Sequence, residues 1–272
     1  MNFLFWNIKK KDTFFSTIVD IIREESIDVA AFAEFPDNQY TTFKQELLRT
    51  GISYQRLVPI KPNKIGLYYK TGVVSILNAY DGERINVNKV LSHIDNKEYL
   101  LVFCHLHSCL YSDRDQQSYL CKHAVDEITE YESTADNYRT LVCGDFNMDP
   151  FDNGMKLCYG FNAMMTESLA SKVTRKVSNQ EYRLFYNPMW GLYGDLHGSD
   201  VPGTFFYSST NPIHQYWHML DQVIMRPDVI PVFDKQRLKI VTKGKHYNLL
   251  NRNNSISAKY SDHLPIKFTL NI

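Results

Sequence analysis

The sequence predicts an α/β domain in which two β-sheets face each other. In the first fifty residues, and again over residues 113–143, apolar runs of strand length alternate with segments of helical periodicity. Between them lies a series of strand-like segments separated by turn residues, as in hairpins. No internal repeat or low-complexity linker divides the 272 residues, so we expect one domain over residues 1–272.

The first fifty residues predict strand, helix, strand and helix in that order. Residues 3–6 form a short apolar strand, and Asp12-Thr13 is the candidate N-cap of the helix that follows. Residues 27–33 are a mostly apolar run that ends at Glu34, as in a central strand covered on both faces. Residues 43–48 suit a second helix.

The middle of the chain predicts consecutive antiparallel strands, with residues 78–82 as one of the turns between them. These strands are expected at residues 65–69, 73–77, 85–90 and 99–104. Residues 113–132 have the four-residue apolar spacing of a helix, and residues 140–143 form the next apolar strand.

The last part of the chain has weaker periodicity. Residues 151–209 combine many aromatic side chains with Pro, Gly and Asn, which predicts an ordered loop region. Two closing strands are expected at residues 220–225 and 264–270, with basic loops between them.

Composition excludes several classes of protein. With 44% hydrophobic and 22% charged residues the chain is globular, and 30 basic against 30 acidic residues leave no global field to attract polyanions. No apolar run approaches the roughly 18 residues of a membrane span, so we expect no membrane insertion. The five cysteines are an odd set without a C-x-x-C pair, which favours reduced thiols and a cytoplasmic location.

Polar side chains recur at the ends of the apolar strands. Several carboxylates that converge on buried strand ends favour a cation, because an unpaired buried charge costs several kcal/mol. Glu34, Asp145 and Asp262 offer the hard oxygen ligands that Mg²⁺ or Mn²⁺ prefers, and Asn7 can add a carbonyl oxygen. Each segment alone also suits a turn or a helix cap. The full set comprises Asn7, Glu34, His105, Asp145, Asn147, Asp221, Asp262 and His263.

Six short motifs resemble, in order, those of the endonuclease/exonuclease/phosphatase superfamily, which has the DNase I-like fold. They are Phe5-Trp6-Asn7, Ala33-Glu34-Phe35, His105-Leu106, Gly144-Asp145-Phe146-Asn147, Leu220-Asp221-Gln222-Val223 and Ser261-Asp262-His263-Leu264-Pro265-Ile266. The resemblance spans residues 3–266 and extends to stand-alone bacterial members. It implies a four-layered α/β sandwich of two mixed β-sheets flanked by helices, and divalent-metal-dependent cleavage of phosphate esters.

The resemblance also implies roles for these residues. Glu34 would be the principal metal ligand, helped by Asn7 and Asp262. His263, oriented by Asp221, would either activate water or stabilise the phosphorane, and Asp145 is the other candidate base. Asn147 and His105 would donate hydrogen bonds to the non-bridging oxygens.

Two neighbouring residues leave questions open. His107 follows His105 by two positions, so on a strand it would face the same side and could share its role. We prefer His105, because the His-Leu pair of the family matches it. Lys9 stands where many nuclease relatives carry an acidic or glycine residue, which leaves a second metal ligand in doubt.

The expected substrate is a nucleic acid, cleaved by a nuclease or phosphodiesterase. The segment 234–259 carries seven basic residues against one acid, and it could line a groove or form a solvated basic hairpin. Aromatic residues in segments 187–190 and 202–207 could stack on bases or pack on the sandwich. The zero net charge favours a small-molecule, phospholipid or inositol phosphate ester instead. A third alternative is a binding module that keeps the fold but has no catalytic activity. No obligate protein partner is implied.

Overall fold

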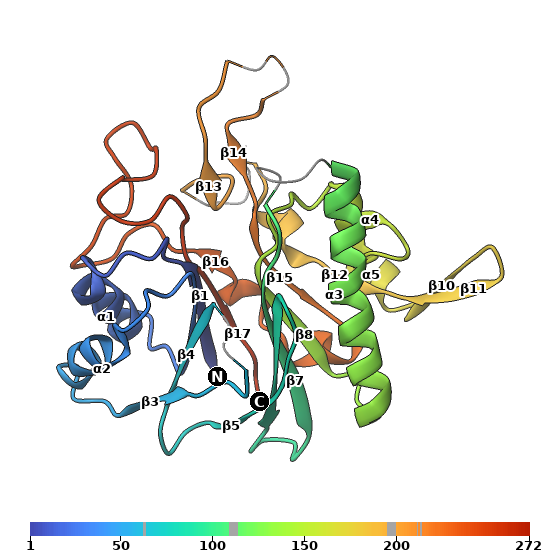
Figure 1. Ribbon diagram of the computed structural model, residues 1–272, viewed down its shortest axis with the longest axis horizontal. Helices are drawn as coiled ribbons and strands as arrows, with labels where there is room; N and C mark the ends of the chain where they lie inside the picture. Colours follow the sequence, from blue (N-terminus) through green and yellow to red (C-terminus); the bar gives the residue numbers. More distant parts are fainter. Residues whose placement is uncertain (62–63, 109–113, 195–199, 211, 213) are drawn as a thin grey trace.

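The computed structural model describes the chain except residues 62–63, 109–113, 195–199, 211 and 213 (Figure 1). In this described part, two large mixed sheets lie side by side with helices outside them. The expected four-layered α/β sandwich is confirmed.

The first sheet contains both ends of the chain. Its order is β16-β17-β1-β2-β4-β3, in which β1 and β2 are parallel and the other neighbours antiparallel. The strands are β1 (Asn2–Asn7), β2 (Val29–Ala33), β3 (Tyr54–Leu57), β4 (Ile65–Lys70), β16 (Lys239–Ile240) and β17 (Ile266–Thr269). Helices α1 (Phe15–Glu24) and α2 (Tyr40–Leu48) cover its outer face (Figure 1).

The second sheet is built from the middle of the chain, in the order β5-β6-β7-β8-β15-β12-β9. Its strands are β5 (Ser75–Asp81), β6 (Ile85–Leu91), β7 (Glu98–His105), β8 (Thr140–Asp145), β9 (Ala163–Met164), β12 (Phe185–Tyr186) and β15 (Asp221–Met225). The long helix α3 (Arg114–Ala135) and the short helix α4 (Asn153–Lys156) lie on its outer side (Figure 1).

Successive side chains of β7 point into two different cores, which shows that this sheet is covered on both faces. Leu101 and Phe103 belong to a core that also contains residues of the first sheet, whereas Val102 and Cys104 pack with residues of α3 such as Ile128. A strand buried on both faces reads as a continuous apolar run, because successive side chains point to opposite sides.

Short elements fill the region 151–209, where the sequence predicted only ordered loops. They include helix α5 (Glu167–Ala170), the 3-10 helix η1 (Pro188–Leu192) and the hairpin of β10 (Thr174–Val177) and β11 (Gln180–Arg183). A second hairpin joins β13 (Phe205–Phe206) to β14 (Trp217–His218) and projects from one end of the sandwich (Figure 1). Two more 3-10 helices, η2 (Pro227–Val232) and η3 (Lys235–Arg237), precede β16.

Three local expectations were wrong. The strand at residues 65–69 is not in the antiparallel series β5-β6-β7, because β4 pairs with β2 in the other sheet. Residues 78–81 are not a turn but the end of β5, where a bulge lies between Asn78 and Tyr80. Asp12-Thr13 does not cap α1, which begins at Phe15 after the packed ring of Phe14.

The described helices include none that combines the length and the apolar character needed to cross a membrane. The described cysteines Cys104, Cys121, Cys143 and Cys158 are free thiols, and Cys109 lies outside the described residues.

Candidate active site

Strand register brings the sequence-predicted polar residues to one edge of the sandwich. Asn7 ends β1, and its register partner Ala33 ends β2 immediately before Glu34. In the second sheet, the terminal residues His105 and Asp145 are register partners on parallel strands. Because parallel strands end at the same edge of a sheet, these side chains meet as the sequence predicted.

Antiparallel partners bring the remaining residues to the same edge. Asp221 begins β15 and is the register partner of Asp145 at the end of β8. His263 precedes β17, which runs antiparallel to β1. The indole of Trp6 donates a hydrogen bond to the backbone oxygen of His263 at 2.8 Å, so the Trp in the first motif holds the last motif in place.

Close backbone approach explains the glycine before Asp145. A Cβ on Gly144 would lie 2.1 Å from the backbone oxygen of Cys104, which is its partner on β7. Only glycine fits such a contact, so this residue allows β7 and β8 to deliver His105 and Asp145 side by side.

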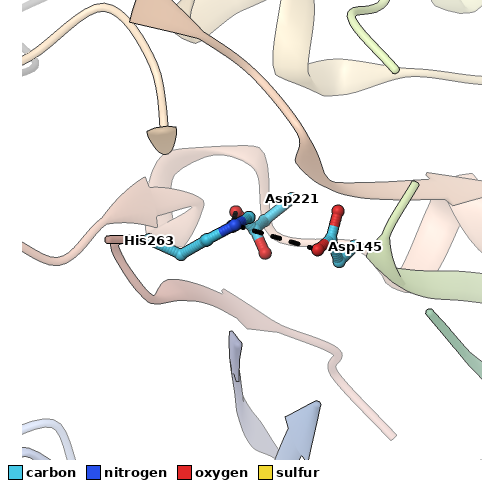
Figure 2. A group of neighbouring side chains, drawn as sticks. All are labelled: Asp145, Asp221 and His263. Atoms are coloured by element: carbon cyan, nitrogen blue, oxygen red, sulfur yellow. Dashed lines mark hydrogen bonds and ion pairs between the residues drawn. The ribbon is translucent and has the colours of Figure 1, made fainter. Parts of the chain in front are cut away.

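His263, Asp221 and Asp145 form a buried group (Figure 2). The Nδ1 atom of His263 lies 2.8 Å from Asp221 Oδ2, and its Nε2 lies 3.9 Å from Asp145 Oδ2. A carboxylate accepts hydrogen bonds, so Nδ1–H of His263 donates to Asp221 and Nε2 is directed to the Asp145 side. The expected His263–Asp221 pair is present.

Charge outweighs burial at His263. Burial alone would lower the pKa of its imidazole, but the negative charges of Asp221 and Asp145 raise this pKa to about 10. Burial also raises the pKa of Asp145, while the nearby His263 opposes that rise. The surroundings of His263 therefore favour its charged imidazolium form beside the carboxylates of Asp221 and Asp145.

Asn7, Glu34 and His105 lie on the other side of Asp145. The amide nitrogen of Asn7 donates to Asp145 Oδ2 at 2.9 Å and lies 3.4 Å from Glu34 Oε1. His105 Nε2 lies 3.7 Å from Glu34 Oε1 and 3.9 Å from Asp145 Oδ2. Glu34 adopts a left-handed backbone with φ of 50°, which turns the chain directly after β2.

The donor set fits a hard divalent ion. Glu34 and Asp145 converge as carboxylates, and His105 Nδ1 and Asp221 Oδ1 are buried atoms without a hydrogen-bond partner among the described residues. Asn7 could present its oxygen to an ion between Glu34 and Asp145 only after its amide turns, because the amide nitrogen now faces these two carboxylates. His263 does not fit as a ligand through Nδ1, which Asp221 occupies.

Asp262 is bound differently from Glu34. Its Oδ2 accepts a hydrogen bond from the ammonium of Lys9 at 2.5 Å. Burial raises the pKa of Asp262, but the bond from Lys9 and the charge of His263 outweigh burial and lower that pKa. Lys9 thus supplies a positive charge beside this carboxylate.

Asn147 and His107 differ from the sequence expectation in detail. The side-chain amide of Asn147 donates to the backbone oxygen of Leu106 at 3.0 Å, which leaves its second amide hydrogen for a ligand. His107 does not share the position of His105, since its ring contacts Arg84 and Glu83 instead. Both histidines line the same cavity, and the preference for His105 stays a prediction.

The site residues other than Asp221 line a cavity of about 1100 Å³. The aromatic rings of Phe205 and Tyr207 also line it, and the Phe205 ring lies 4.9 Å from that of His263. Trp190 and its neighbours in segment 187–190 do not, and Pro188 and Met189 are buried by packing instead. Of the two aromatic segments named from the sequence, 202–207 is therefore the one placed to stack on bases in this cavity.

Apart from Lys9, the positive charges at the cavity come from residues that the sequence analysis did not name. Lys9, Lys10, Lys64 and Arg84 line it, whereas no residue of the basic segment 234–259 does. In that segment, Lys239 pairs with Glu25 and Lys243 pairs with Asp200. Only proximity to a motif could have indicated Lys10, and no sequence signal marks Lys64 or Arg84.

A further missed residue, Asp149, fixes the base of the β13–β14 hairpin. Its Oδ2 accepts from Nδ1 of His218 at 2.6 Å, and its Oδ1 accepts from the backbone N–H of Met219 at 2.7 Å. Nε2 of His218 lies 3.4 Å from Nε2 of His214, which continues the chain of polar contacts along the hairpin. Asp149 thereby positions the hairpin that carries Phe205 and Tyr207.

Comparison with solved structures shows the same fold at low sequence identity. An endonuclease/exonuclease/phosphatase family protein of Bacteroides thetaiotaomicron is 14% identical, with TM-score 0.59 over 98% of this chain and 96% of that one. D. rerio TDP2, complexed with a single-strand DNA product, is 14% identical with TM-score 0.58 over 100% and 99%. A mannosyl-6-phosphatase of B. thetaiotaomicron is 14% identical with TM-score 0.59 over 99% of each chain.

No curated protein matches the sequence. The sequence model of the endonuclease/exonuclease/phosphatase family, however, matches residues 4–263, which include every candidate site residue from Asn7 to His263. The chain therefore belongs to the endonuclease/exonuclease/phosphatase family, whose members hydrolyse phosphate esters.

Proposed function

We propose that the protein is a divalent-metal-dependent phosphodiesterase that hydrolyses nucleic-acid phosphodiester bonds. The observation that carries this proposal is the His263–Asp221 pair, which faces Asp145 in a cavity also lined by Glu34 and by four cationic side chains. Such a cavity presents acid–base groups to a phosphate and positive charge to the rest of a polyanion.

Glu34 is the principal candidate to hold Mg²⁺ or Mn²⁺, with Asn7 and Asp262 as further oxygen donors. When bound, the ion supplies Lewis-acid polarisation of the phosphate and stabilises the leaving oxygen. Lys9 competes for Asp262, because its ammonium already binds that carboxylate. This competition favours a single ion held on the Glu34 side.

In this proposal His263 stabilises charge in the transition state and Asp145 accepts a proton. The charged imidazole of His263, oriented by Asp221, stabilises the negative charge that grows on the phosphorane. Asp145 then accepts the proton of the attacking water, because its carboxylate oxygens retain lone pairs beyond the bonds from Asn7 and Asn147. His105 and the free amide hydrogen of Asn147 donate to the non-bridging oxygens.

Nucleic acid is the preferred substrate because cations and aromatic rings line one cavity. Lys10, Lys64 and Arg84 suit phosphates, and the exposed ring of Tyr207 suits a base, for which stacking contributes ~1–3 kcal/mol. D. rerio TDP2 with its DNA product shares the fold, but so does a mannosyl-6-phosphatase. The second candidate is therefore a phosphatase or phosphodiesterase acting on a small-molecule or phospholipid headgroup ester.

We also propose that residues 1–272 act as one catalytic domain in a reducing compartment such as the cytoplasm. The core that joins both sheets supports the first statement, and the free thiols of the described cysteines support the second. No obligate protein partner is part of the proposal.

The test is hydrolysis of a substrate panel with Mg²⁺, with Mn²⁺ and with EDTA. The panel holds single-stranded DNA and RNA, plasmid, inositol phosphates and a generic phosphodiester. We expect metal-dependent cleavage of the nucleic acids, abolished in Glu34→Ala and reduced about 10²–10⁴-fold in kcat in His263→Ala. Preference for a small phosphate ester would support the second candidate instead.

Matched substitutions outside the site are the controls for these variants. Glu46→Ala removes a carboxylate on α2, and His93→Ala removes an imidazole away from the cavity. Both should keep the wild-type rate, and circular dichroism should show all four variants folded. Wild-type rates in Glu34→Ala or His263→Ala would reject the assigned roles.

A further inference from the structure

His107 has a neighbourhood of its own, separate from the catalytic group. Its Nδ1 lies 3.2 Å from the guanidinium nitrogen Nη2 of Arg84. Arginine has no acceptor, so Arg84 donates to an unprotonated Nδ1 and the neutral ring carries its proton on Nε2. His107 therefore offers an N–H donor at Nε2, and it lines the same cavity as His105.

Positive charge surrounds this donor. Burial and the charges of Arg84 and Lys64 lower the pKa of His107, and the same two cations act in the same direction on His105. Arg84 is anchored beside β7, because its backbone oxygen accepts from the N–H of His105 at 3.0 Å. Arg84 thus lies on the side of the cavity where β7 ends, and Lys64, just before β4, lines the same cavity.

The counter-charge in this corner is loosely held. Glu83 Oε1 lies 3.8 Å from Nε of Arg84 and 3.7 Å from Nε2 of His107, and the Glu83 side chain is 77% exposed. Ion pairs of such exposure contribute little, so an incoming anion can displace Glu83 at small cost. Lys9, by contrast, is already bound to Asp262.

We propose that Arg84, His107 and Lys64 form a subsite for a second phosphate of the substrate, beside the phosphate that is cleaved. Arg84 offers its guanidinium, His107 its Nε2–H and Lys64 its ammonium, a donor set that suits phosphate oxygens. The inference rests on the proposed phosphoester hydrolysis at Glu34, Asp145 and His263. The second phosphate is either the neighbouring diester of a nucleic-acid strand or a terminal monoester of a small molecule.

Binding without turnover is the first test. Titration calorimetry compares thymidine 3′,5′-bisphosphate with thymidine 5′-monophosphate on the wild type, Arg84→Met and His107→Gln. We expect the wild type to bind the bisphosphate about tenfold more tightly, the effect of one charge-assisted hydrogen bond, and both variants to lose most of this preference. Equal affinities in the wild type, or a full preference in Arg84→Met, would overturn the subsite.

Hydrolysis distinguishes the source of the second phosphate. In a single-stranded oligonucleotide, cleavage is followed at one linkage whose neighbour is either a native diester or an uncharged methylphosphonate. If a strand supplies the second phosphate, the uncharged neighbour raises KM about tenfold in the wild type and less than twofold in Arg84→Met. A bisphosphate preference without this KM effect assigns the subsite to a terminal monoester.

Two exposed residues provide matched controls. Arg49→Met and His93→Gln change the same residue types at the C-terminal end of α2 and on the loop after β6, and both should behave as the wild type. If the bisphosphate preference holds while no ester in the panel is hydrolysed, the subsite stands and the proposed function falls. Hydrolysis without any second-phosphate effect gives the opposite result.

Discussion

Asp221 and Asp145 hold His263 in its charged form although burial opposes that charge. The pKa of His263 in the folded chain, about 10, lies above its ordinary value of 6.5. Protonated His263 therefore stabilises the fold fully below pH 6.5, and this contribution declines as the pH rises toward 10. Protonation of His263, a residue of the candidate catalytic group, therefore contributes to the free energy of unfolding.

Asp221→Asn should reveal this link in the metal-free protein. The substitution removes the negative charge that sustains the imidazolium, so the loss in free energy of unfolding should be larger at pH 6.5 than at pH 9.5. Urea unfolding in EDTA at several pH values measures the difference. Asp234→Asn, which changes an exposed cap of η3, should lose the same amount at every pH. A pH-independent loss in Asp221→Asn would contradict the linkage.

Single residues were predictable where a strand end and a motif coincide. Glu34, His105 and Asp145 follow apolar runs, and the structure brings them within contact of one another. The partners of these side chains were not predictable, because rotamers depend on the completed fold. The bond from Asn147 to Leu106 and the bond from Lys9 to Asp262 are examples. Exposed cations such as Lys64 belong to no pattern at all.

Elements were predictable where burial imposes a pattern, and their pairing was not. The apolar runs of β2, β7 and β8 identify central strands, because both faces of each are covered. The alternation of apolar and polar residues in β4 does not indicate that this strand pairs with β2 in the first sheet. Polar residues at the end of β5 resemble a turn, yet Asp81 there is satisfied by Asn86 and by the backbone N–H of Lys61.

A buried ion pair joins Glu132 of the long helix α3 to Arg226, which follows β15. We expect the free energy of unfolding to depend strongly on this one contact. Both side chains are buried, at 0% and 3% exposure, and two N–O distances are 2.9 Å. Glu132→Gln should lower the free energy of unfolding by about 3–5 kcal/mol, because it leaves an unpaired buried guanidinium. Chemical denaturation measures this loss.

An apolar replacement of both partners separates charge from packing. Arg226→Met combined with Glu132→Leu should recover much of the stability, since neither variant side chain leaves a buried charge. Asp126→Asn, which breaks an exposed pair with Lys122 on the same helix, should change stability by less than about 0.5 kcal/mol. A double variant as unstable as Glu132→Gln would show that the pair contributes more than mutual neutralisation.

The whole molecule has no net charge, but its positive charge is placed unevenly. The segment 234–259 carries a formal charge of +6, since it has seven basic residues and one acid. Part of that charge is neutralised by acids outside the segment, as in the pairs of Lys239 with Glu25 and of Lys235 with Glu167. The cavity instead draws its cations from the turn after β1, the approach to β4 and the start of β6.

Salt dependence distinguishes these two sets of cations. Each phosphate neutralised on a single strand contributes a slope of about −0.7 to a plot of log affinity against log salt. If Lys10 and Lys64 each contact a phosphate, Lys10→Gln with Lys64→Gln should reduce the slope by about 1.4, measured as kcat/KM on single-stranded substrate at about 50–200 mM KCl. Lys239→Gln, Lys243→Gln and Lys245→Gln together remove more charge outside the cavity and should leave the slope unchanged. A reduced slope in this triple variant alone would place the nucleic acid on the basic segment and not in the cavity.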